Sequence, residues 1–346
     1  MPSLKNVRRW LLPCAALPLA GCDTVLLRPS GDVAAQQGHL VVLSTLLMLL
    51  IIVPVIVVTL VFAWRYRQSN TDATYSPDWD HSIQLELVIW AAPLLIVIAL
   101  GALTWISTHT LDPYRPLQRI DAQRRVPGAT EPLNVEVVAL DWKWLFVYPD
   151  QGVAVVNELA APVDRPIRFR ITAASVMNSF YIPALAGQIY AMPGMETTLH
   201  AVINRTGAYD GFSANYSGAG FSDMRFKFHG MSADDFDRWV QAAKAGGNTL
   251  SRDGYLQLER PSEREPVRRY GAVAPGLYDL VVNRCVVPGT MCMRNMKAAG
   301  PRGETGLARS VDAIARDPAM PSRAPVGAVC TAQAPFGATL SYAVRD

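Results

Sequence analysis

The sequence predicts an α+β membrane protein in which a two-helix transmembrane hairpin precedes an all-β sandwich, a C-terminal helix and an irregular tail. Two observations predict this class. Apolar residues are concentrated in three stretches near the N-terminus, whereas the chain beyond about residue 110 has the composition of a soluble protein. Short alternating runs then follow one another between about residues 130 and 230, and clusters of Gly, Pro, Asn and Asp separate them.

Bulk composition sets wider limits on the function. The 346 residues leave room for about two domains, and 50% of them are hydrophobic. The net charge of +3 is small, and no block of Lys and Arg resembles the basic footprint of a nucleic-acid-binding protein. No two cysteines form a C-x-x-C pair, which leaves a thioredoxin-like centre, a c-type haem and the usual zinc spacings unsupported. The cysteines are Cys14, Cys22, Cys285, Cys292 and Cys330.

Residues 1–21 have the features of a secretory signal. Basic residues precede an apolar run over residues 10–20 that is too short to span a bilayer. The run ends in Leu-Ala-Gly-Cys, which resembles the lipobox of bacterial lipoproteins. This resemblance implies that residues 1–21 are removed and that Cys22 is the lipid attachment site. The alternative is an ordinary signal peptide with a chance cysteine.

Two apolar stretches predict the transmembrane helices. The first covers residues 40–64, is dominated by Leu, Val and Ile, and contains no charged residue. Its ~24 uncharged residues extend over about 36 Å at 1.5 Å per residue, enough to cross a hydrocarbon core of about 30 Å. The second helix is predicted over residues 83–108, and it is uncharged from residue 87 onward.

The topology follows from the number of spans. If Cys22 is released on the periplasmic side, residues 22–39 are periplasmic, and residues 65–82 form a short cytoplasmic loop. Everything after about residue 110 is then periplasmic. Glu86 lies where the second helix begins, at the cytoplasmic boundary. It is either an interfacial carboxylate or a group that faces a partner helix, and the first interpretation is favoured.

Residues 125–232 are predicted to form the periplasmic sandwich. Residues 167–171 alternate cleanly, with apolar residues on one side and arginine on the other. Residues 133–139, 197–203 and 224–228 behave similarly. An amphipathic helix over residues 233–248 follows, with Ser232 as its N-cap, acidic residues in its first turn and a Gly-Gly pair at its end.

Four segments, taken in their order along the chain, resemble those of a known family. They are Val138–Trp144, Ser175–Leu185, Gly187–Gly194 and Gly211–Gly218. Together they resemble subunit II of bacterial haem–copper ubiquinol oxidases of the cytochrome bo type, over roughly residues 20–245. The resemblance implies a cupredoxin-like Greek-key sandwich in a multi-pass lipoprotein of the bacterial inner membrane.

The same resemblance implies a function. The chain is expected to be subunit II of a proton-pumping ubiquinol:oxygen oxidoreductase in the aerobic respiratory chain, with a structural and assembly role. Its expected partners are subunits I, III and IV, membrane lipids and the ubiquinol that the complex uses. The haems, the copper and the catalytic centres are expected in subunit I, so no catalytic residue and no cofactor are expected in this chain.

In the cytochrome c oxidase branch of the family, this domain holds a two-copper centre that takes up electrons. Carried over residue by residue, its two histidines, two bridging cysteines and carbonyl-ligating glutamate are replaced here, and the methionine alone remains, as Met224. In chain order the vacated copper-ligand positions are Asn178, Ser213, Asn215, Ser217, Phe221 and Met224. Hydroxyls, carboxamides and a phenyl ring do not replace the soft thiolates and imidazoles that hold copper. The resemblance therefore implies no metal at this site.

Two other functions are weighed against this one. A copper-containing electron-transfer subunit of a cytochrome c oxidase is the main alternative, and the ligand substitutions oppose it. A free-standing lipoprotein binding module is the other. The aromatic segment over residues 141–146 is expected to serve packing, and neither His200 nor His229 has a second metal ligand at usable spacing.

The segment over residues 249–346 is rich in Pro, Arg, Ala and Gly and is predicted to be a partly irregular extension. Cys285 and Cys292 are close enough in sequence to form a disulfide in the oxidising periplasm, which would leave Cys330 over. Any of the three pairings remains open.

Overall fold

The structure, a computed structural model, describes residues 25–299 except residues 75, 77 and 129. The chain divides into two units, Met1–Met293 and Arg294–Asp346, and α7 (Met293–Ala299) begins at the boundary. The predicted signal segment, the predicted lipid attachment site Cys22, and Cys330 lie outside the described residues.

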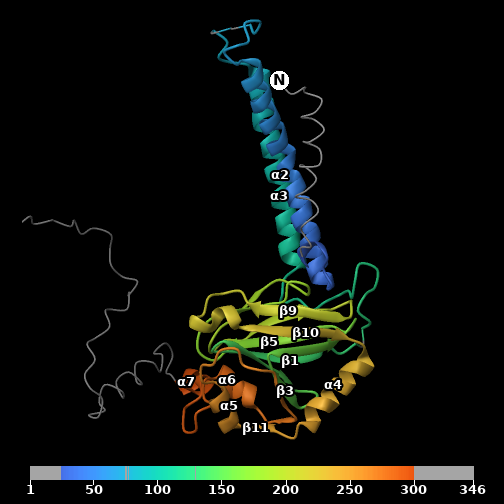
Figure 1. The fold of residues 1–346 in the computed structure, drawn as a ribbon, viewed down its shortest axis with the longest axis vertical. Helices are drawn as coiled ribbons and strands as arrows, with labels where there is room; N and C mark the ends of the chain where they lie inside the picture. The colour runs from blue at the N-terminus through green and yellow to red at the C-terminus, as the bar shows by residue number, and fades with distance from the viewer. Residues whose placement is uncertain (1–24, 75, 77, 129, 300–346) are drawn as a thin grey trace, which may run out of the picture. The chain divides into compact units, whose positions relative to one another are not determined.

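Two long helices are apolar enough to cross a membrane. They are α2 (Asp32–Arg65) and α3 (Ile83–Thr110), which lie side by side in Figure 1 and contact each other. Most of their Leu, Ile and Val side chains are exposed, as surfaces that face lipid require. The side chain of Ser82 caps α3 by accepting a hydrogen bond from the N–H of Leu85.

Helix α2 begins at Asp32, about two turns before the predicted span over residues 40–64. The reason is contact with the sandwich. The N–H groups of Ser30 and Gly31 both donate to the carbonyl of Ala184, at 3.0 and 2.9 Å. Arg119 then donates to both carboxylate oxygens of the buried Asp32, at 2.8 and 3.0 Å. The first turn of α2 therefore contacts the sandwich domain and is not part of the apolar span.

The domain is a sandwich of two sheets, as predicted. One sheet has six strands in the order β12-β3-β2-β1-β5-β8, and the other has five in the order β4-β10-β9-β6-β7. Most neighbours are antiparallel, but β1 pairs with β5, and β4 with β10, in parallel. In chain order the strands of the two sheets are β1 (Leu133–Leu140), β2 (Lys143–Tyr148), β3 (Val153–Val156), β4 (Glu158–Pro162), β5 (Ile167–Ala173), β6 (Asn178–Tyr181), β7 (Ile189–Ala191), β8 (Thr197–Ala201), β9 (Gly207–Ser213), β10 (Arg225–Met231) and β12 (Arg268–Tyr270).

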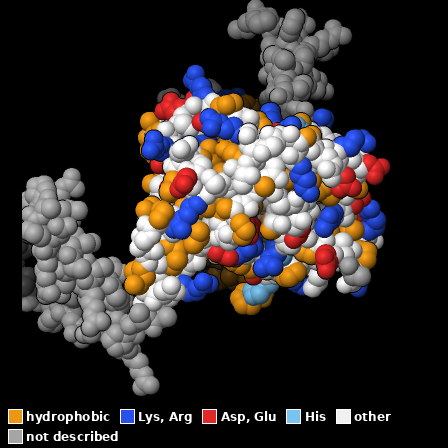
Figure 2. All heavy atoms as spheres, turned by 90° about the horizontal axis from the view of Figure 1, so that it is seen from below, with side chains coloured by type: hydrophobic (Ala, Val, Ile, Leu, Met, Phe, Trp, Pro, Cys, Tyr) orange, Lys and Arg blue, Asp and Glu red, His pale blue; other side chains and the backbone are white. Residues whose placement is uncertain are grey.

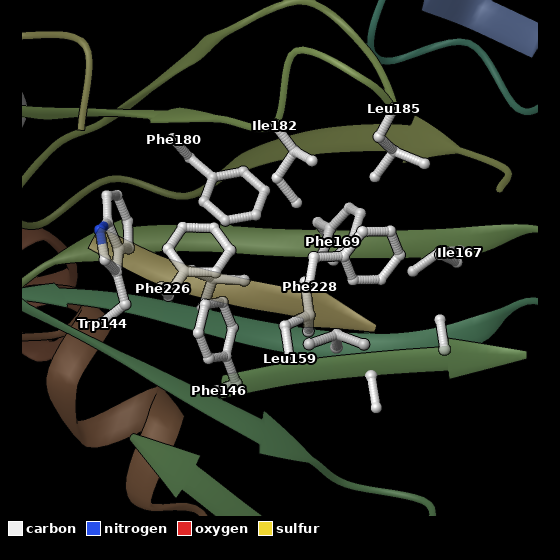
Figure 3. Packing of buried hydrophobic residues seen from close by; sticks show 14 of the residues in the cluster. Trp144, Phe146, Leu159, Ile167, Phe169, Phe180, Ile182, Leu185, Phe226 and Phe228 are labelled. Atoms are coloured by element: carbon white, nitrogen blue, oxygen red, sulfur yellow. The ribbon is translucent and has the colours of Figure 1, made fainter. Parts of the chain in front are cut away.

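Aromatic rings fill the space between the two sheets (Figure 3). Phe180 and Phe226 are stacked with their ring centroids 5.5 Å apart, and Trp144 meets the edge of Phe180 at 5.4 Å. Strand β5 supplies Phe169 to this core and turns Arg168 outward, which confirms the alternation predicted there. Such rings contribute both buried area and specific edge-to-face contacts.

A second hydrophobic cluster covers the other face of the six-stranded sheet. The chain after residue 248 was predicted to be a partly irregular extension, and no helix or strand was assigned to it. In the described residues, β11 (Thr249–Leu250), α5 (Arg252–Leu258), β13 (Ala272–Val273) and α6 (Leu277–Val282) fold against β1, β2 and β3. This cluster buries Val138, Leu140, Leu145, Val147, Ala154, Val156, Leu250, Tyr255, Leu258, Leu277, Tyr278, Val281 and Val286. The extension is ordered over this part because the apolar outer face of the sheet requires a cover.

Helix α4 (Ala233–Ala245) begins at the predicted residue and ends three residues before the predicted end at residue 248. The hydroxyl of Ser232 accepts a hydrogen bond from the N–H of Asp235 at 3.1 Å, as an N-cap does. The helix ends at the Gly-Gly pair and buries Phe236 and Trp239 against the sandwich.

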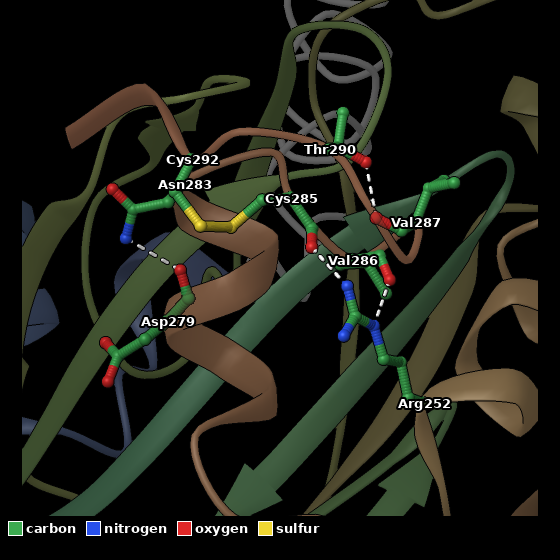
Figure 4. The surroundings of a disulfide bond; sticks show 8 residues. All are labelled: Arg252, Asp279, Asn283, Cys285, Val286, Val287, Thr290 and Cys292. Atoms are coloured by element: carbon green, nitrogen blue, oxygen red, sulfur yellow. Dashed lines mark hydrogen bonds between the residues drawn. A yellow bond between two sulfur atoms is a disulfide. The ribbon is translucent and has the colours of Figure 1, made fainter. Parts of the chain in front are cut away.

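A disulfide joins Cys285 to Cys292, one of the three pairings left open by the sequence (Figure 4). Arg252 on α5 holds the loop that the disulfide closes. Its guanidinium donates to the carbonyl of Cys285 at 2.7 Å and to the carbonyl of Val286. The extension is thus held by a covalent link as well as by its apolar contacts.

Charged side chains are mixed on the surface of the domain. On the face that Figure 2 shows, Lys and Arg side chains lie among Asp and Glu, with hydrophobic side chains between them. No large area of one sign is visible on this face, which agrees with the small net charge of +3.

Candidate functional site

The six vacated ligand positions lie on, or just beyond the ends of, three neighbouring strands of the five-stranded sheet, β6, β9 and β10. Asn178 begins β6, and Ser213 ends the neighbouring strand β9. Asn215 and Ser217 follow in the loop after β9. Phe221 lies in the short 3-10 helix η3 (Ala219–Asp223), and Met224 directly precedes β10. Strand pairing therefore brings the six positions to one end of the sandwich.

The side chains at the first two positions bond to each other. The hydroxyl of Ser213 donates to the side-chain oxygen of Asn178 at 3.1 Å and lies 3.2 Å from the carbonyl oxygen of Asn215. It also accepts from the N–H of Ser179 at 3.4 Å. Asn178 and Ser213 are both buried, so these bonds satisfy groups that water does not reach.

The loop after β9 is held by side-chain hydrogen bonds from Asn215 and Trp142. The amide of Asn215 donates to the carbonyls of Met177 and Tyr216, at 3.2 and 3.3 Å. The carbonyl of Ser217 accepts the indole N–H of Trp142 at 3.1 Å. The hydroxyl of Ser217 is buried and has no partner among the residues that the structure describes.

The last two positions complete the loop with apolar groups. The ring of Phe221 meets the exposed ring of Tyr216 edge to face at 5.6 Å. Met224 is buried in the main core, and its carbonyl accepts from the N–H of Ser213 at 3.2 Å. Its thioether therefore takes part in core packing beside the other positions.

A depression of about 330 Å³ adjoins this loop. Its lining combines rings, two serines and one arginine, namely Phe212, Ser213, Ala214, Phe221, Ser222 and Arg225. Within residues 25–299, as far as they are described, no group of three or more His, Cys, Asp or Glu side chains is arranged to hold a metal ion.

Trp142 holds the loop in a way that the sequence did not reveal. It lies in the β1–β2 turn with φ 65°, a left-handed conformation that a bulky side chain rarely adopts. Its ring lies directly under two glycines: a Cβ on Gly218 would be 3.1 Å from the ring, and one on Gly220 would be 2.6 Å from it. The pair of glycines in Gly218-Ala-Gly220 is the one sequence signal of this close approach.

The C-terminal extension also reaches the loop, although the sequence predicted a sandwich domain that ends at residue 232. Arg264 forms an ion pair of 2.8 Å with Asp223 in η3. The buried ammonium of Lys143 donates to the carbonyl of Arg260 and to the hydroxyl of Ser262, each at 2.7 Å. Burial lowers the pKa of Lys143, and the nearby carboxylate of Glu265 opposes this shift.

The two histidines lie away from this loop. His200 on β8 is half-buried, and burial together with Arg168 lowers its pKa. His229 on β10 lies 3.8 Å from the carboxylate of Glu158. At the start of α3, Glu86 is exposed and its carboxylate lies 2.7 Å from the ring of His81.

Comparison with protein families gives two matches within the periplasmic part. Residues 150–230 match the model of the cytochrome c oxidase subunit II periplasmic domain. Residues 244–289 match the COX aromatic-rich motif, which covers most of the ordered extension.

Curated relatives match most of the chain. It is 50% identical over 268 residues to the cytochrome bo(3) ubiquinol oxidase subunit 2 of Pseudomonas putida, covering 78% of this chain and 82% of that protein. It is 49% identical to the ubiquinol oxidase subunit 2 of Acetobacter aceti, covering 78% and 85%. Among solved structures, the periplasmic domain of cytochrome oxidase subunit II from Bradyrhizobium japonicum has 26% identity and a TM-score of 0.32, with 33% of this chain and 94% of that chain covered.

Proposed function

From the premise that this chain belongs to the family of cytochrome bo(3) ubiquinol oxidase subunit 2, we propose that it stabilises and caps subunit I without a copper centre of its own. Membership makes it a subunit of a ubiquinol oxidase complex in a respiratory chain. Its two apolar helices and its periplasmic domain fit an inner membrane protein. The proposal goes further, to the division of labour between the subunits.

One observation carries the proposal: the hydroxyl of Ser213, at a bridging-cysteine position, is already engaged by its neighbours. The hydroxyl of Ser213 is engaged by Asn178, Asn215 and Ser179, so it does not point to an open coordination site. A hydroxyl also keeps its proton at neutral pH, whereas a bridging ligand between two copper ions must be anionic and soft. The donor set therefore does not fit a thiolate-bridged copper pair.

Electrons then have to reach the oxidase by another route. A quinol dissolves in the bilayer and delivers electrons directly to a membrane-embedded site, so it needs no periplasmic relay. The haems, the oxygen-reducing copper and the coupled proton pumping accordingly belong to subunit I. Subunits III and IV complete the proposed assembly.

The test is the metal content and donor preference of the purified oxidase. We expect no stoichiometric copper pair in this subunit, no purple mixed-valence absorption, and oxidation of ubiquinol but not of reduced cytochrome c. Two copper ions per polypeptide, or brisk oxidation of cytochrome c, would establish the alternative of a copper-containing electron-transfer subunit. Extraction of this chain in mild detergent without a haem-containing partner would contradict membership in a complex.

The second part of the proposal is lipid attachment at Cys22. The lipobox supports it, and several acyl chains would hold the mature N-terminus at the outer leaflet, since each buried methylene contributes roughly 0.8 kcal/mol. Intact mass of the mature chain tests this. We expect a species that begins at Cys22 and carries acyl mass, which Cys22→Ala abolishes with little loss of activity because two helices already anchor the chain.

A further inference from the structure

Three apolar residues lie exposed just before the first transmembrane helix. They form the 3-10 turn η2 (Val25–Leu27), and their side chains are 49%, 40% and 58% exposed for Val25, Leu26 and Leu27. None of these residues is buried. A fully apolar turn of this kind in water calls for a second surface to cover it.

The position of η2 is fixed at both ends. After the turn, Ser30 and Gly31 are bonded to the carbonyl of Ala184 in the sandwich, and Gly31 forms a β-bridge with Ile203. Before that point the chain runs back along α2, because η2 and α2 contact each other. One close approach is at Gly38, where a Cβ would lie 2.7 Å from the carbonyl oxygen of Leu26.

This contact sets the depth of η2 relative to the membrane. Gly38 is six residues beyond the first residue of α2, which places it about 9 Å along the helix axis, away from the sandwich. The uncharged run of α2 begins two residues later, at Leu40. The three apolar side chains are therefore level with the beginning of the span, where headgroups meet acyl chains.

The surface of α2 just beyond Gly38 is of the same kind. Val41 and Val42 lie three and four residues after Gly38, on the same helical face, and each is 42% exposed. The exposed apolar surface of η2 thus continues directly into that of the transmembrane helix. A lipid surface covers both without a change of chemistry.

We infer that η2 is a membrane-interface wedge, with Val25, Leu26 and Leu27 inserted among the outer-leaflet lipids and held at that depth by the contact of Leu26 with Gly38. Cys22 is three residues before Val25 in the sequence, and the wedge does not depend on acylation of Cys22.

Spin-label accessibility in the intact oxidase tests the wedge. Leu27→Cys is labelled in a Cys330→Ser background, and the complex is placed in nanodiscs of phosphatidylethanolamine and phosphatidylglycerol. Two labelled positions give the limits: Leu50→Cys, 67% exposed in the middle of α2, and Val267→Cys, 49% exposed before β12. The Cys330→Ser oxidase without an introduced cysteine, treated with the same label, gives the background signal.

The measured quantity is the ratio of the label's collision rate with oxygen to its collision rate with a water-soluble nickel complex. We expect this ratio to be several-fold higher at position 27 than at position 267, and lower than at position 50. A ratio equal to that at position 267 would overturn the inference. So would a label inaccessible to both reagents, because another protein chain would then cover η2.

A second variant tests what holds the wedge. Gly38→Val places side-chain atoms where the carbonyl of Leu26 now lies, and should shift the label at position 27 toward the water-exposed ratio. Gly101→Val in α3, where a Cβ meets nothing within 4 Å, is the matched control and should leave the ratio unchanged. An unchanged ratio in Gly38→Val would show that the contact does not position η2.

Discussion

Trp239 on α4 donates its indole N–H to the carboxylate of Glu158 at 2.9 Å, in the interior of the domain. The same carboxylate accepts two hydrogen bonds from Arg269 on β12, at 2.9 and 2.8 Å. Glu158 is only 7% exposed, so its charge depends on these partners. One buried carboxylate on β4 thus joins the helix and the C-terminal extension to the sandwich.

Removing the arginine should loosen both elements. Arg269→Met leaves each carboxylate oxygen of Glu158 with one hydrogen bond fewer. We expect the free energy of local unfolding of α4 to fall by about 2–3 kcal/mol. Native-state hydrogen exchange of the α4 amides in the purified oxidase measures it. Arg238→Met is the matched control, because its ion pair with Asp235 is solvent-exposed and should contribute less than about 1 kcal/mol. Equal effects of the two substitutions would contradict the role of Glu158.

Ser213→Ala separates a structural from a catalytic role of the vacated site. The substitution removes the donor to Asn178, and we expect about 1–2 kcal/mol less protection of the β6 and β9 amides, with ubiquinol oxidation unchanged. Ser222→Ala, an exposed position in the same loop, should change neither. Loss of activity with intact amide protection would assign the site a part in electron transfer.

Gly211→Ala should be among the most damaging small substitutions in the core. A Cβ at this position would lie 2.1 Å from the ring of Phe226, which is itself stacked on Phe180. We expect destabilisation of about 1–3 kcal/mol or more, because the ring has to leave its place. Gly128→Ala, with nothing within 4 Å of its Cβ, is the control. The melting temperatures of the two variants should differ clearly, and similar values would be inconsistent with this packing.

Glu136 predicts a pH dependence of stability. Burial raises its pKa from 4.5 to about 7, although Arg170 lies 2.7 Å away, and the carboxylates of Asp279 and Glu196 add to the rise. The folded state therefore binds a proton more tightly than the unfolded state, so this stability is present below pH 4.5 and is lost as the pH rises through about 7.

The variant Glu136→Gln should remove that loss. Exchange of the β1 and β5 amides, corrected for intrinsic rates, should show opening free energies that fall from pH 5 to pH 7 in the wild-type oxidase. In Glu136→Gln this part of the fall should disappear. Parallel profiles for the two proteins would mean that another group is responsible.

The sequence predicted the fold best where each strand has one buried and one exposed face. Strand β5 alternates because Ile167 and Phe169 enter the core while Arg168 faces solvent. Helix α4 was predicted through its cap and its glycines, which are local signals.

The helices of the extension were not predicted because they are too short to show a period. α5 has 7 residues and α6 has 6, about two turns each. A different signal was present in the strands. All six residues of β2 are buried, and its sequence Lys-Trp-Leu-Phe-Val-Tyr does not alternate, which indicates a sheet covered on both faces.

At the candidate site, the family resemblance supplied the six positions, and strand pairing accounts for their proximity. The groups that hold the loop could not be foreseen. The left-handed φ of Trp142 is not encoded by a residue type that favours it, and the pair Arg264–Asp223 joins residues 41 positions apart. Both depend on tertiary structure alone.

The double-sided burial of the six-stranded sheet has a consequence for anyone who shortens this chain. A soluble fragment that stops after α4 would keep a complete sandwich core but leave Val138, Leu145 and Val156 facing water. Such a fragment should self-associate through a flat aliphatic strip that the intact polypeptide never presents. Shortened chains meant for crystallisation or binding assays should therefore extend at least through Cys292, where the disulfide closes the loop.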